Sequence, residues 1–359
     1  MPYTPEASVA YLQRVLDLAK RCGEVMGPLL SHVSTADTAR DIDALRAGLG
    51  EDKITYAGLS YGTVLGQTYL NMFPQHVRAM MLDSVVDGVP FPKSAEDRQR
   101  DRNSTDEVYD QFAKLCDEAG PTTCKLAGHP GQTTAQRVDQ LLEKLRNGTI
   151  PAPHANPHGE LDYGDALYTF GALKDPNTWP DWAEKLNAAA DGDGSALETD
   201  GRLSRTPNAF AEATKSSAIS CLDGPAGLPV SAWPTFLPEL VQHSRWRGAI
   251  SAWWLWAPCA ANWPAQGNDR YAGPWNAKTD VPVLLINARY DPNTGYQGAV
   301  NVSTQLCNAV LLTLNGYGHV TSHDPSACIE KARVAYLVDL VVPAAGTVCE
   351  ADRRPFGLS

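Results

Sequence analysis

Lys53-Ile-Thr-Tyr-Ala-Gly-Leu-Ser-Tyr-Gly62 joins a strand-like run to a serine flanked by glycines. The helix-like run Thr63–Phe73 follows at once, so the G-x-S-x-G pattern lies between a predicted strand and a predicted helix. In that setting the pattern forms a sharp turn, and its glycines leave room for a serine with a strained backbone and an exposed hydroxyl. The stretch therefore predicts Ser60 as a nucleophile.

Other apolar runs alternate between strand-like and helix-like patterns. The predicted strands are Lys53–Ala57, Val77–Val86, Val281–Ala288 and Ala309–Leu314. The predicted helices start at Ser34 or span Thr63–Phe73, Gly295–Leu306 and Ala327–Val341. This alternation is typical of a parallel sheet with helices on its faces. We therefore expect an α/β fold whose sheet is mostly parallel.

The alternation is interrupted between Pro90 and Asp280, where the sequence is rich in Pro, Gly and Trp and contains helix-like stretches such as Asp106–Glu118 and Thr134–Arg146. A long insertion between two strand–helix units is most simply a lid or cap over an edge of the sheet. We therefore predict a core made of residues 1–89 and 281–359, with a largely helical lid at 90–280.

Composition excludes several classes of function. The 359 residues carry a net charge of −11, with a pI of about 5.2, which argues against a nucleic-acid partner because phosphate binding requires a basic surface. No run approaches the roughly 20 apolar residues that cross a bilayer. No phosphate-binding or dinucleotide-binding glycine motif and no metal-ligand cluster occurs, so we expect no cofactor.

Eight cysteines favour disulfides and an oxidising compartment. Cys116 and Cys124 bracket a short loop that a bridge would staple, Cys328 and Cys349 bracket the last helix and the tail, and Cys221 and Cys259 flank a Trp-rich region. Spacing alone leaves the pairing open. No C-x-x-C pair occurs, which argues against zinc or thioredoxin-like chemistry.

A serine nucleophile needs a base and an acid that orients the base. In α/β-hydrolases they follow the serine in the order acid, then histidine, at the carboxyl ends of later strands. Asp291 follows the strand that ends at Ala288, and His319 follows the strand Ala309–Leu314 on a glycine-flanked turn. We therefore predict the triad Ser60, Asp291 and His319.

Each member has an alternative. Asp83 ends the strand before the insertion and is a rival acid, and Asp291 can also be an Asx-turn residue because Pro292 follows it. His323 is a rival base, and the His319/His323 pair is a weak metal-site candidate because no helical H-E-x-x-H frame surrounds it.

The oxyanion hole normally combines the N–H after the nucleophile with a second N–H from a much earlier loop. Tyr61 supplies the first donor. No glycine-rich loop after an apolar strand precedes Ser60, so the second donor is missing from this prediction.

The motifs together resemble the secreted bacterial tripeptidyl aminopeptidases, which are proline-iminopeptidase-like serine peptidases of the α/β-hydrolase fold with a TAP-like C-terminal domain. The resemblance covers nearly the whole chain. It rests on Tyr56-Ala-Gly-Leu-Ser-Tyr-Gly-Thr63, Ala218-Ile-Ser-Cys-Leu-Asp223, Cys259-Ala-Ala-Asn-Trp-Pro264, Asp291-Pro-Asn-Thr294 and Gly316-Tyr-Gly-His319.

The resemblance implies a secreted or envelope-associated enzyme, which we expect to be monomeric, that releases tripeptides from free N-termini through an acyl-enzyme. It also implies the same triad and an acidic group that holds the substrate ammonium. Asp223 is a candidate for this group, with helix capping or another hydrogen-bonding role as its alternative.

The chain departs from the family before Ser60. The export signal, several early strands and a glycine-rich oxyanion loop of the family have no counterpart, and the family partner of Cys22 would lie in that segment. We therefore expect an N-terminally truncated form, a mis-assigned start or half of a split protein, and we expect this chain to be poorly active alone. Two other functions stay open: an esterase or lipase with the same triad, and a non-catalytic or inactive fragment that lacks a full oxyanion hole.

Overall fold

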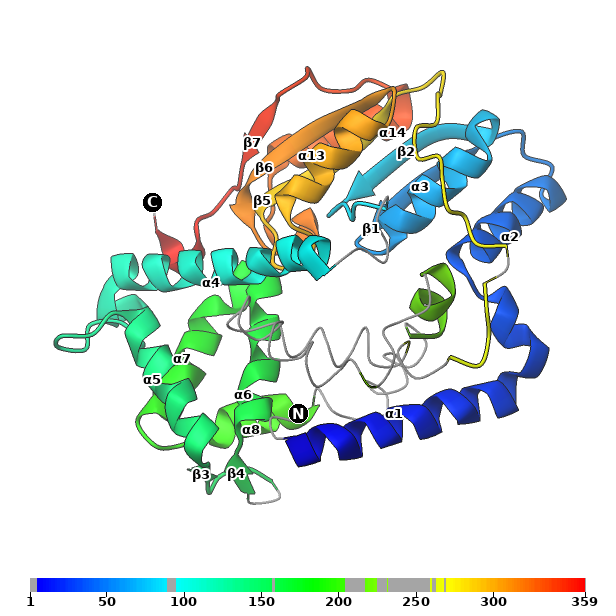
Figure 1. Ribbon diagram of the computed structural model, residues 1–359. Coiled ribbons are helices and arrows are strands. Elements are labelled where there is room, and N and C mark those ends of the chain that lie inside the picture. Colours follow the sequence, from blue (N-terminus) through cyan, green and yellow to red (C-terminus); the bar gives the residue numbers. More distant parts are fainter. Residues whose placement is uncertain are drawn as a thin grey trace.

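The computed structural model describes residues 5–88, 95–156, 159–203, 217–224, 231, 259, 263–267 and 269–358 (Figure 1). Within this part of the chain, five parallel strands form one sheet in the order β1-β2-β5-β6-β7. The strands are β1 (Ile54–Leu59), β2 (Val77–Asp83), β5 (Val283–Tyr290), β6 (Ala309–Tyr317) and β7 (Val348–Glu350). The predicted parallel α/β sheet is confirmed, and β7 is an additional edge strand.

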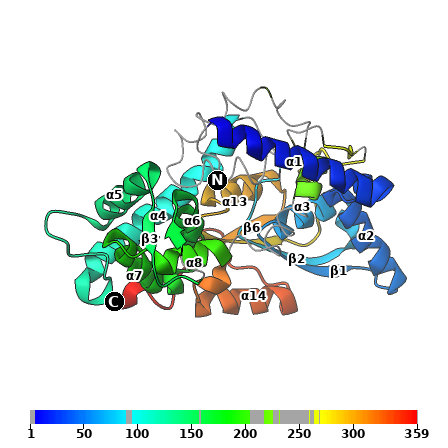
Figure 2. The same cartoon turned by 90° about the horizontal axis from the view of Figure 1, so that it is seen from below.

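Helices cover both faces of the sheet because the strand side chains alternate between them. On one face, Met80 and Leu285 pack with side chains of α2 (Thr35–Gly48), α3 (Gly62–Met72) and α13 (Tyr296–Gln305). On the other face, Met81 and Ile286 pack against α14 (Ala327–Asp339). Figure 2 shows α14 on the opposite side of the strands from α3 and α13. The result is a three-layer α/β/α core.

Local signals explain where these helices begin. Ser34 and Asp37 form a reciprocal capping box at the start of α2. Ser326 caps α14 through the N–H of Ile329. Before α2 lie α1 (Pro5–Met26) and η1 (Gly27–His32), so the described chain reaches its first strand only at Ile54.

A second group of helices follows β2 and has a hydrophobic core of its own. It contains α4 (Ala95–Thr123), α5 (Thr134–Asn147), α6 (Tyr163–Tyr168), η3 (Thr169–Lys174), η4 (Pro176–Thr178), α7 (Trp179–Ala190) and α8 (Ser195–Leu203), with the hairpin β3 (Ile150–Ala152) and β4 (Gly159–Leu161). We call Ala95–Leu203 the helical insertion.

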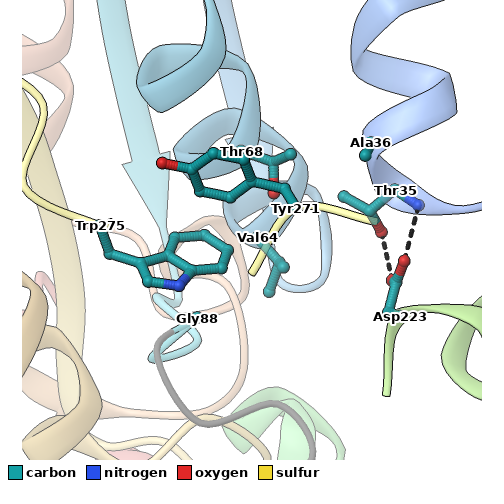
Figure 3. Close-up of a pocket in the computed structure, with 8 residues that line it drawn as sticks. All are labelled: Thr35, Ala36, Val64, Thr68, Gly88, Asp223, Tyr271 and Trp275. Carbon is teal, nitrogen blue, oxygen red and sulfur yellow. Dashed lines mark hydrogen bonds between the residues drawn. The ribbon is translucent and has the colours of Figure 1, made fainter. Parts of the chain in front are cut away.

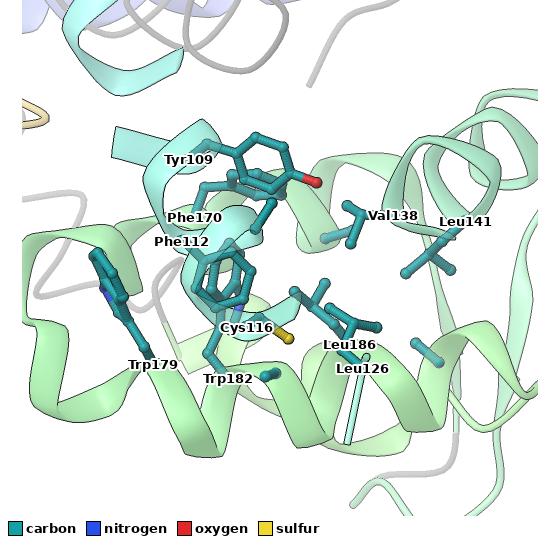
Figure 4. Close-up of a cluster of buried hydrophobic side chains, with 14 of the residues drawn as sticks. Tyr109, Phe112, Cys116, Leu126, Val138, Leu141, Phe170, Trp179, Trp182 and Leu186 are labelled. Carbon is teal, nitrogen blue, oxygen red and sulfur yellow. The ribbon is translucent and has the colours of Figure 1, made fainter. Parts of the chain in front are cut away.

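Phe112, Phe170 and Trp182 lie in the core of the helical insertion (Figure 4). The ring centroid of Trp182 lies 4.7 Å from that of Phe112 and 4.8 Å from that of Phe170. Trp182 also donates through Nε1 to Thr169 Oγ1 at 3.0 Å.

The helical insertion meets the rest of the molecule at the C-terminal tail and at one end of the sheet. Phe356 of η8 (Pro355–Gly357) joins its core, and Tyr290 and Tyr317 at the ends of β5 and β6 pack against it. Asp106–Glu118 was predicted as helical and lies in α4. The predicted boundary at Pro90 and residues 232–258 of the predicted lid lie outside the described residues, so the division at 90 and 280 stays a prediction.

Three disulfides are present: Cys116–Cys124, Cys221–Cys259 and Cys328–Cys349. They join the pairs that bracket the loop, the Trp-rich region and the last helix. Cys22 and Cys307 are free. In the part of the chain that the structure describes, no helix has the length and apolar character needed to cross a membrane.

Candidate active site

Ser60 lies directly after β1 in a backbone conformation that side chains rarely adopt, with φ of 54°. Its N–H still donates to the carbonyl of Asp83 on β2 at 3.0 Å, and its own carbonyl accepts from the N–H and hydroxyl of Thr63 at 2.8 and 2.7 Å. The serine is therefore held on both sides at the point where the strand turns into α3.

The two glycines of the turn differ in how strictly they are needed. A Cβ on Gly58 would lie 2.5 Å from the carbonyl oxygen of Gly62, whereas a Cβ on Gly62 would meet only the Tyr56 hydroxyl at 3.8 Å. Both glycines were expected to relieve crowding, but the close backbone approach occurs only at Gly58.

The structure brings Ser60, His319 and Asp291 together, although 231 and 28 positions separate Asp291 from the other two in sequence. His319 Nε2 lies 2.7 Å from Ser60 Oγ, and His319 Nδ1 lies 3.0 Å from both carboxylate oxygens of Asp291. An ionised carboxylate only accepts hydrogen bonds, so Nδ1 carries the proton and Nε2 accepts from the serine hydroxyl. This arrangement is able to remove the proton from Ser60.

Asp291 is fully buried and accepts several hydrogen bonds besides that of the imidazole. One oxygen accepts from the N–H groups of Asn293 and Thr294 at 2.8 and 2.9 Å. The other accepts from the hydroxyls of Ser84 and Thr294 at 2.6 and 2.7 Å. Burial raises the pKa of this carboxyl, but the hydrogen bond and charge of His319 and the hydroxyls of Ser84 and Thr294 outweigh burial, and the pKa lies below its ordinary value.

The turn that carries His319 is held through its backbone. Gly318 N–H donates to the carbonyl of Tyr290 at 2.9 Å, and His319 N–H donates to the carbonyl of Lys174 in η3 at 2.8 Å. Gly318 has φ of 96°, and a Cβ there would lie 2.6 Å from the Lys174 carbonyl oxygen. The helical insertion thus touches the backbone of the predicted base, and this close approach requires glycine.

The next two residues of the same turn are bound by the end of β2. Val320 N–H donates to Ser84 Oγ at 2.7 Å, and Thr321 donates to the Asp83 carboxylate through its N–H at 3.2 Å and its hydroxyl at 2.6 Å. Arg333 of α14 also binds Asp83. Burial raises the pKa of the Asp83 carboxyl, and Thr321 and Arg333 oppose that rise.

These contacts separate the predicted residues from their rivals. Asp83 binds Arg333 and the turn that follows His319, whereas the imidazole of His319 bonds Asp291. His323 uses Nδ1 to bond the carbonyl of His319 at 2.7 Å, so it supports the turn rather than facing Ser60. Among the described residues, no group of three or more His, Cys, Asp or Glu is arranged to hold a metal ion.

Tyr61, the predicted oxyanion donor, is the N-cap residue of α3. Its N–H therefore lies at the positive end of a helix, where negative charge is stabilised. From Pro5 to Lys53 the described chain contains helices and their connections, with no strand followed by a glycine-rich loop. A second donor of the usual kind is therefore not found in this part of the chain.

Asp223, the predicted ammonium anchor, lies at the edge of a small, partly open cavity (Figure 3). Its carboxylate accepts from the N–H of Thr35 at 2.8 Å, from the Thr35 hydroxyl, and from the hydroxyl of Tyr61 at 2.6 Å. Thr35 is the first residue of α2, so Asp223 binds a helix N-terminus, as its alternative reading expected. The cavity is lined by Thr35, Ala36, Val64, Thr68, Gly88, Asp223, Tyr271 and Trp275.

Sequence reasoning missed Ser84 and Thr294 as partners of Asp291. Thr294 stands three positions after Asp291 in an Asx-like turn, and that spacing was a usable signal. Ser84 had no such signal, because its contact with Asp291 spans two neighbouring strands.

Residues 248–349 match the TAP-like protein family. Over 354 residues the chain is 32% identical to "Serine protease Hip1" of Mycobacterium tuberculosis, a match that covers 92% of this chain and 64% of Hip1. It is 31% identical to "Tripeptidyl aminopeptidase" of Streptomyces lividans, covering 94% of this chain and 62% of that protein. It is 30% identical to "Carboxylesterase B" of Mycobacterium tuberculosis, covering 97% of this chain and 66% of that protein. The chain thus spans less than two thirds of the length of these relatives.

Proposed function

Because the chain carries a TAP-like segment on an α/β-hydrolase sheet, we propose that it is a serine peptidase that releases short peptides, tripeptides in particular, from free N-termini. The observation that carries this proposal is the continuous chain of hydrogen bonds from Ser60 Oγ through His319 to Asp291. The similarity to a tripeptidyl aminopeptidase and to a serine protease supports the peptide substrate.

The geometry supports an acyl-enzyme mechanism. His319 Nε2 takes the proton of Ser60 as Oγ attacks the carbonyl carbon of the scissile peptide bond, and Asp291 stabilises the imidazolium that forms. The N–H of Tyr61 donates to the developing oxyanion. His319 then gives its proton to the leaving amine, and a water molecule, deprotonated by the same imidazole, hydrolyses the ester on Ser60.

Asp223 is our candidate for binding the free ammonium of the peptide. Its carboxylate borders the cavity and accepts a hydrogen bond from the hydroxyl of Tyr61, the residue that follows the nucleophile. Among the described residues, its carboxylate accepts from the N–H and hydroxyl of Thr35 and from the hydroxyl of Tyr61, while the Arg270 guanidinium donates to the backbone carbonyl of Asp223 at 3.5 Å instead. A substrate ammonium would supply the missing positive charge.

The experiment that tests the proposal compares three chromogenic substrates with wild type and Ser60→Ala. The substrates are an Ala-Ala-Pro p-nitroanilide with a free N-terminus, its N-acetylated form, and p-nitrophenyl butyrate. We expect wild type to prefer the free peptide and Ser60→Ala to lose turnover by about 10³-fold or more. Equal turnover of the free and acetylated peptides would overturn recognition of the N-terminus.

Ester hydrolysis is the second candidate function, because one relative is named a carboxylesterase and the same three residues would perform it. A higher kcat/KM for p-nitrophenyl butyrate than for both peptides would favour this function.

We also propose that the protein is secreted or associated with the cell envelope and is monomeric. The three disulfides support an oxidising compartment. Cell fractionation, with light scattering of the purified chain, tests both statements. Recovery in the cytosol with the cysteines reduced would contradict the first, and a mass twice that of the chain would contradict the second.

A further inference from the structure

Ser84 occupies an unusual place at the carboxyl end of β2. It is fully buried and has φ of 58°, although it is not a glycine. Its N–H extends the sheet by donating to the carbonyl of Ile286 on β5 at 2.9 Å, and the chain then turns away. A buried side chain in this backbone conformation persists only where the surrounding contacts hold it.

The hydroxyl of Ser84 joins two parts of the predicted site. It donates to Asp291 Oδ2 at 2.6 Å and accepts the N–H of Val320 at 2.7 Å. Asp291 is the predicted acid, and Val320 directly follows the predicted base, His319. A single side chain thus contacts the carboxylate and the turn that carries the imidazole.

The neighbouring residue reinforces this contact. Asp83 binds both the N–H and the hydroxyl of Thr321, one position after Val320, and is itself bound by Arg333. Val320 also has a positive φ, 68°, so the turn after His319 depends on these contacts for its shape. Asp83 and Ser84, at the end of β2, therefore hydrogen-bond to the consecutive turn residues Val320 and Thr321.

We propose that Ser84 is a positioning residue that sets the orientation of His319 relative to Asp291 by holding the carboxylate and the histidine turn at once. The inference rests on the proposed function, because it assigns Ser84 to that same triad. Ser84 is fully buried and its hydroxyl binds Asp291 and Val320, so we expect it to act on the rate of the chemical steps rather than on substrate binding.

The test uses three substitutions of Ser84 and one control. Ser84→Gly removes the hydroxyl and suits the positive φ, whereas Ser84→Ala removes the hydroxyl and keeps the strain. Ser84→Cys keeps a weak donor and acceptor. The control is Tyr336→Phe, because the Tyr336 hydroxyl bonds Met80 of β2 and Pro282, which precedes β5, and bonds none of the three predicted catalytic residues.

For the free tripeptide anilide we expect Ser84→Gly and Ser84→Ala to lower kcat by about 10- to 100-fold while KM changes by less than about threefold. Ser84→Cys should recover part of the rate. Tyr336→Phe should lower the melting temperature and leave kcat unchanged. If Ser84→Gly retained the wild-type kcat, or if Tyr336→Phe lost as much, Ser84 would be a structural residue only.

A spectroscopic measurement separates this inference from the proposed function. The proton shared by His319 Nδ1 and Asp291 should give a far-downfield proton NMR resonance, absent in His319→Gln. We expect Ser84→Gly to shift or broaden this resonance in folded protein. If wild type cleaves neither peptide nor ester, the proposed function fails while the resonance still tests Ser84. An unchanged resonance in Ser84→Gly would overturn the inference.

Discussion

Ser60 and Ser84 leave neighbouring parallel strands at the same level of the sheet, because Leu59 and Asp83, which precede them, are register partners. Both adopt positive φ values, 54° and 58°, after donating one last hydrogen bond to the next strand. The same backbone conformation therefore follows both strands. It directs the Ser60 hydroxyl toward His319 and the Ser84 hydroxyl toward Asp291.

The difference between the glycines of the serine turn leads to a prediction about stability. Gly58→Ala places a methyl group 2.5 Å from the carbonyl oxygen of Gly62, which the backbone has to move to accommodate. We expect a loss of about 1–3 kcal/mol in the free energy of unfolding. Gly62→Ala is the matched control, because its Cβ meets only ordinary contacts. Urea unfolding measures both variants, and equal losses would contradict the structure of the turn.

Gly318 and Gly346 provide a second matched pair. Both have positive φ, 96° and 78°. A Cβ added to Gly318 would lie 2.6 Å from the Lys174 carbonyl oxygen, whereas a Cβ added to Gly346 would have no neighbour within 4 Å. Gly346→Ala should cost about 1 kcal/mol of stability from backbone strain and leave kcat unchanged. Gly318→Ala should also displace His319 and lower kcat by about 100-fold. Steady-state kinetics and urea unfolding test the pair, and a fully active Gly318→Ala enzyme would show that Lys174 does not constrain the turn.

Asp324 predicts a pH dependence of stability. Burial raises the pKa of this carboxyl to about 6, with the charges of Asp175 and Asp352 adding to the rise and the N–H of Tyr317 opposing it. A raised pKa means that the folded protein holds this proton more tightly than the unfolded chain, so the contribution of Asp324 to stability falls as the pH rises from about 4 to about 6.

Asp324→Asn removes this decline, because an amide stays neutral and still accepts the N–H of Tyr317. We therefore expect the melting temperature of the variant, relative to wild type, to increase between about pH 4 and about pH 7. Thermal unfolding at both pH values measures it. A difference that stays constant or decreases with pH would contradict the raised pKa.

Asp223 yields a prediction about substrate preference. Asp223→Asn keeps an oxygen to accept the N–H of Thr35, turns a donating amide group toward the hydroxyls of Thr35 and Tyr61, and removes the charge that we assign to the peptide ammonium. We expect kcat/KM to fall by about tenfold or more for the free tripeptide anilide and to change little for the acetylated form. Asp269→Asn, at an exposed position, is the control. A parallel loss on both substrates would assign Asp223 to the capping of α2 alone.

The parts of the site that were predictable are those with a local signal. Ser60, Asp291 and His319 each follow an apolar strand, and glycine, proline or Asx-turn patterns mark the turns. The predicted positions of the strand ends were less accurate. Val77–Val86 was predicted as one strand, but β2 ends at Asp83, because Ser84 turns the chain at a position that no local residue pattern marks.

The rest depends on pairing between distant segments. The contact of Ser84 with Asp291 requires the order and register of β2 and β5, and the contact of Tyr61 with Asp223 spans 162 positions. Edge strand β7 is three residues long, too short for a periodic pattern to reveal. Its partner β6 supplies the hydrogen bonds that define it.

Activation of Ser60 by His319 is tested most directly by the rate at which a fluorophosphonate labels Ser60, followed by peptide mass spectrometry. We expect a single adduct on Ser60 in wild type, formed about 100-fold more slowly or not at all in His319→Gln, because the hydroxyl then lacks its base. Circular dichroism establishes that both proteins are folded. Folded wild type that takes no label, or His319→Gln that reacts at the wild-type rate, would show that His319 does not activate Ser60.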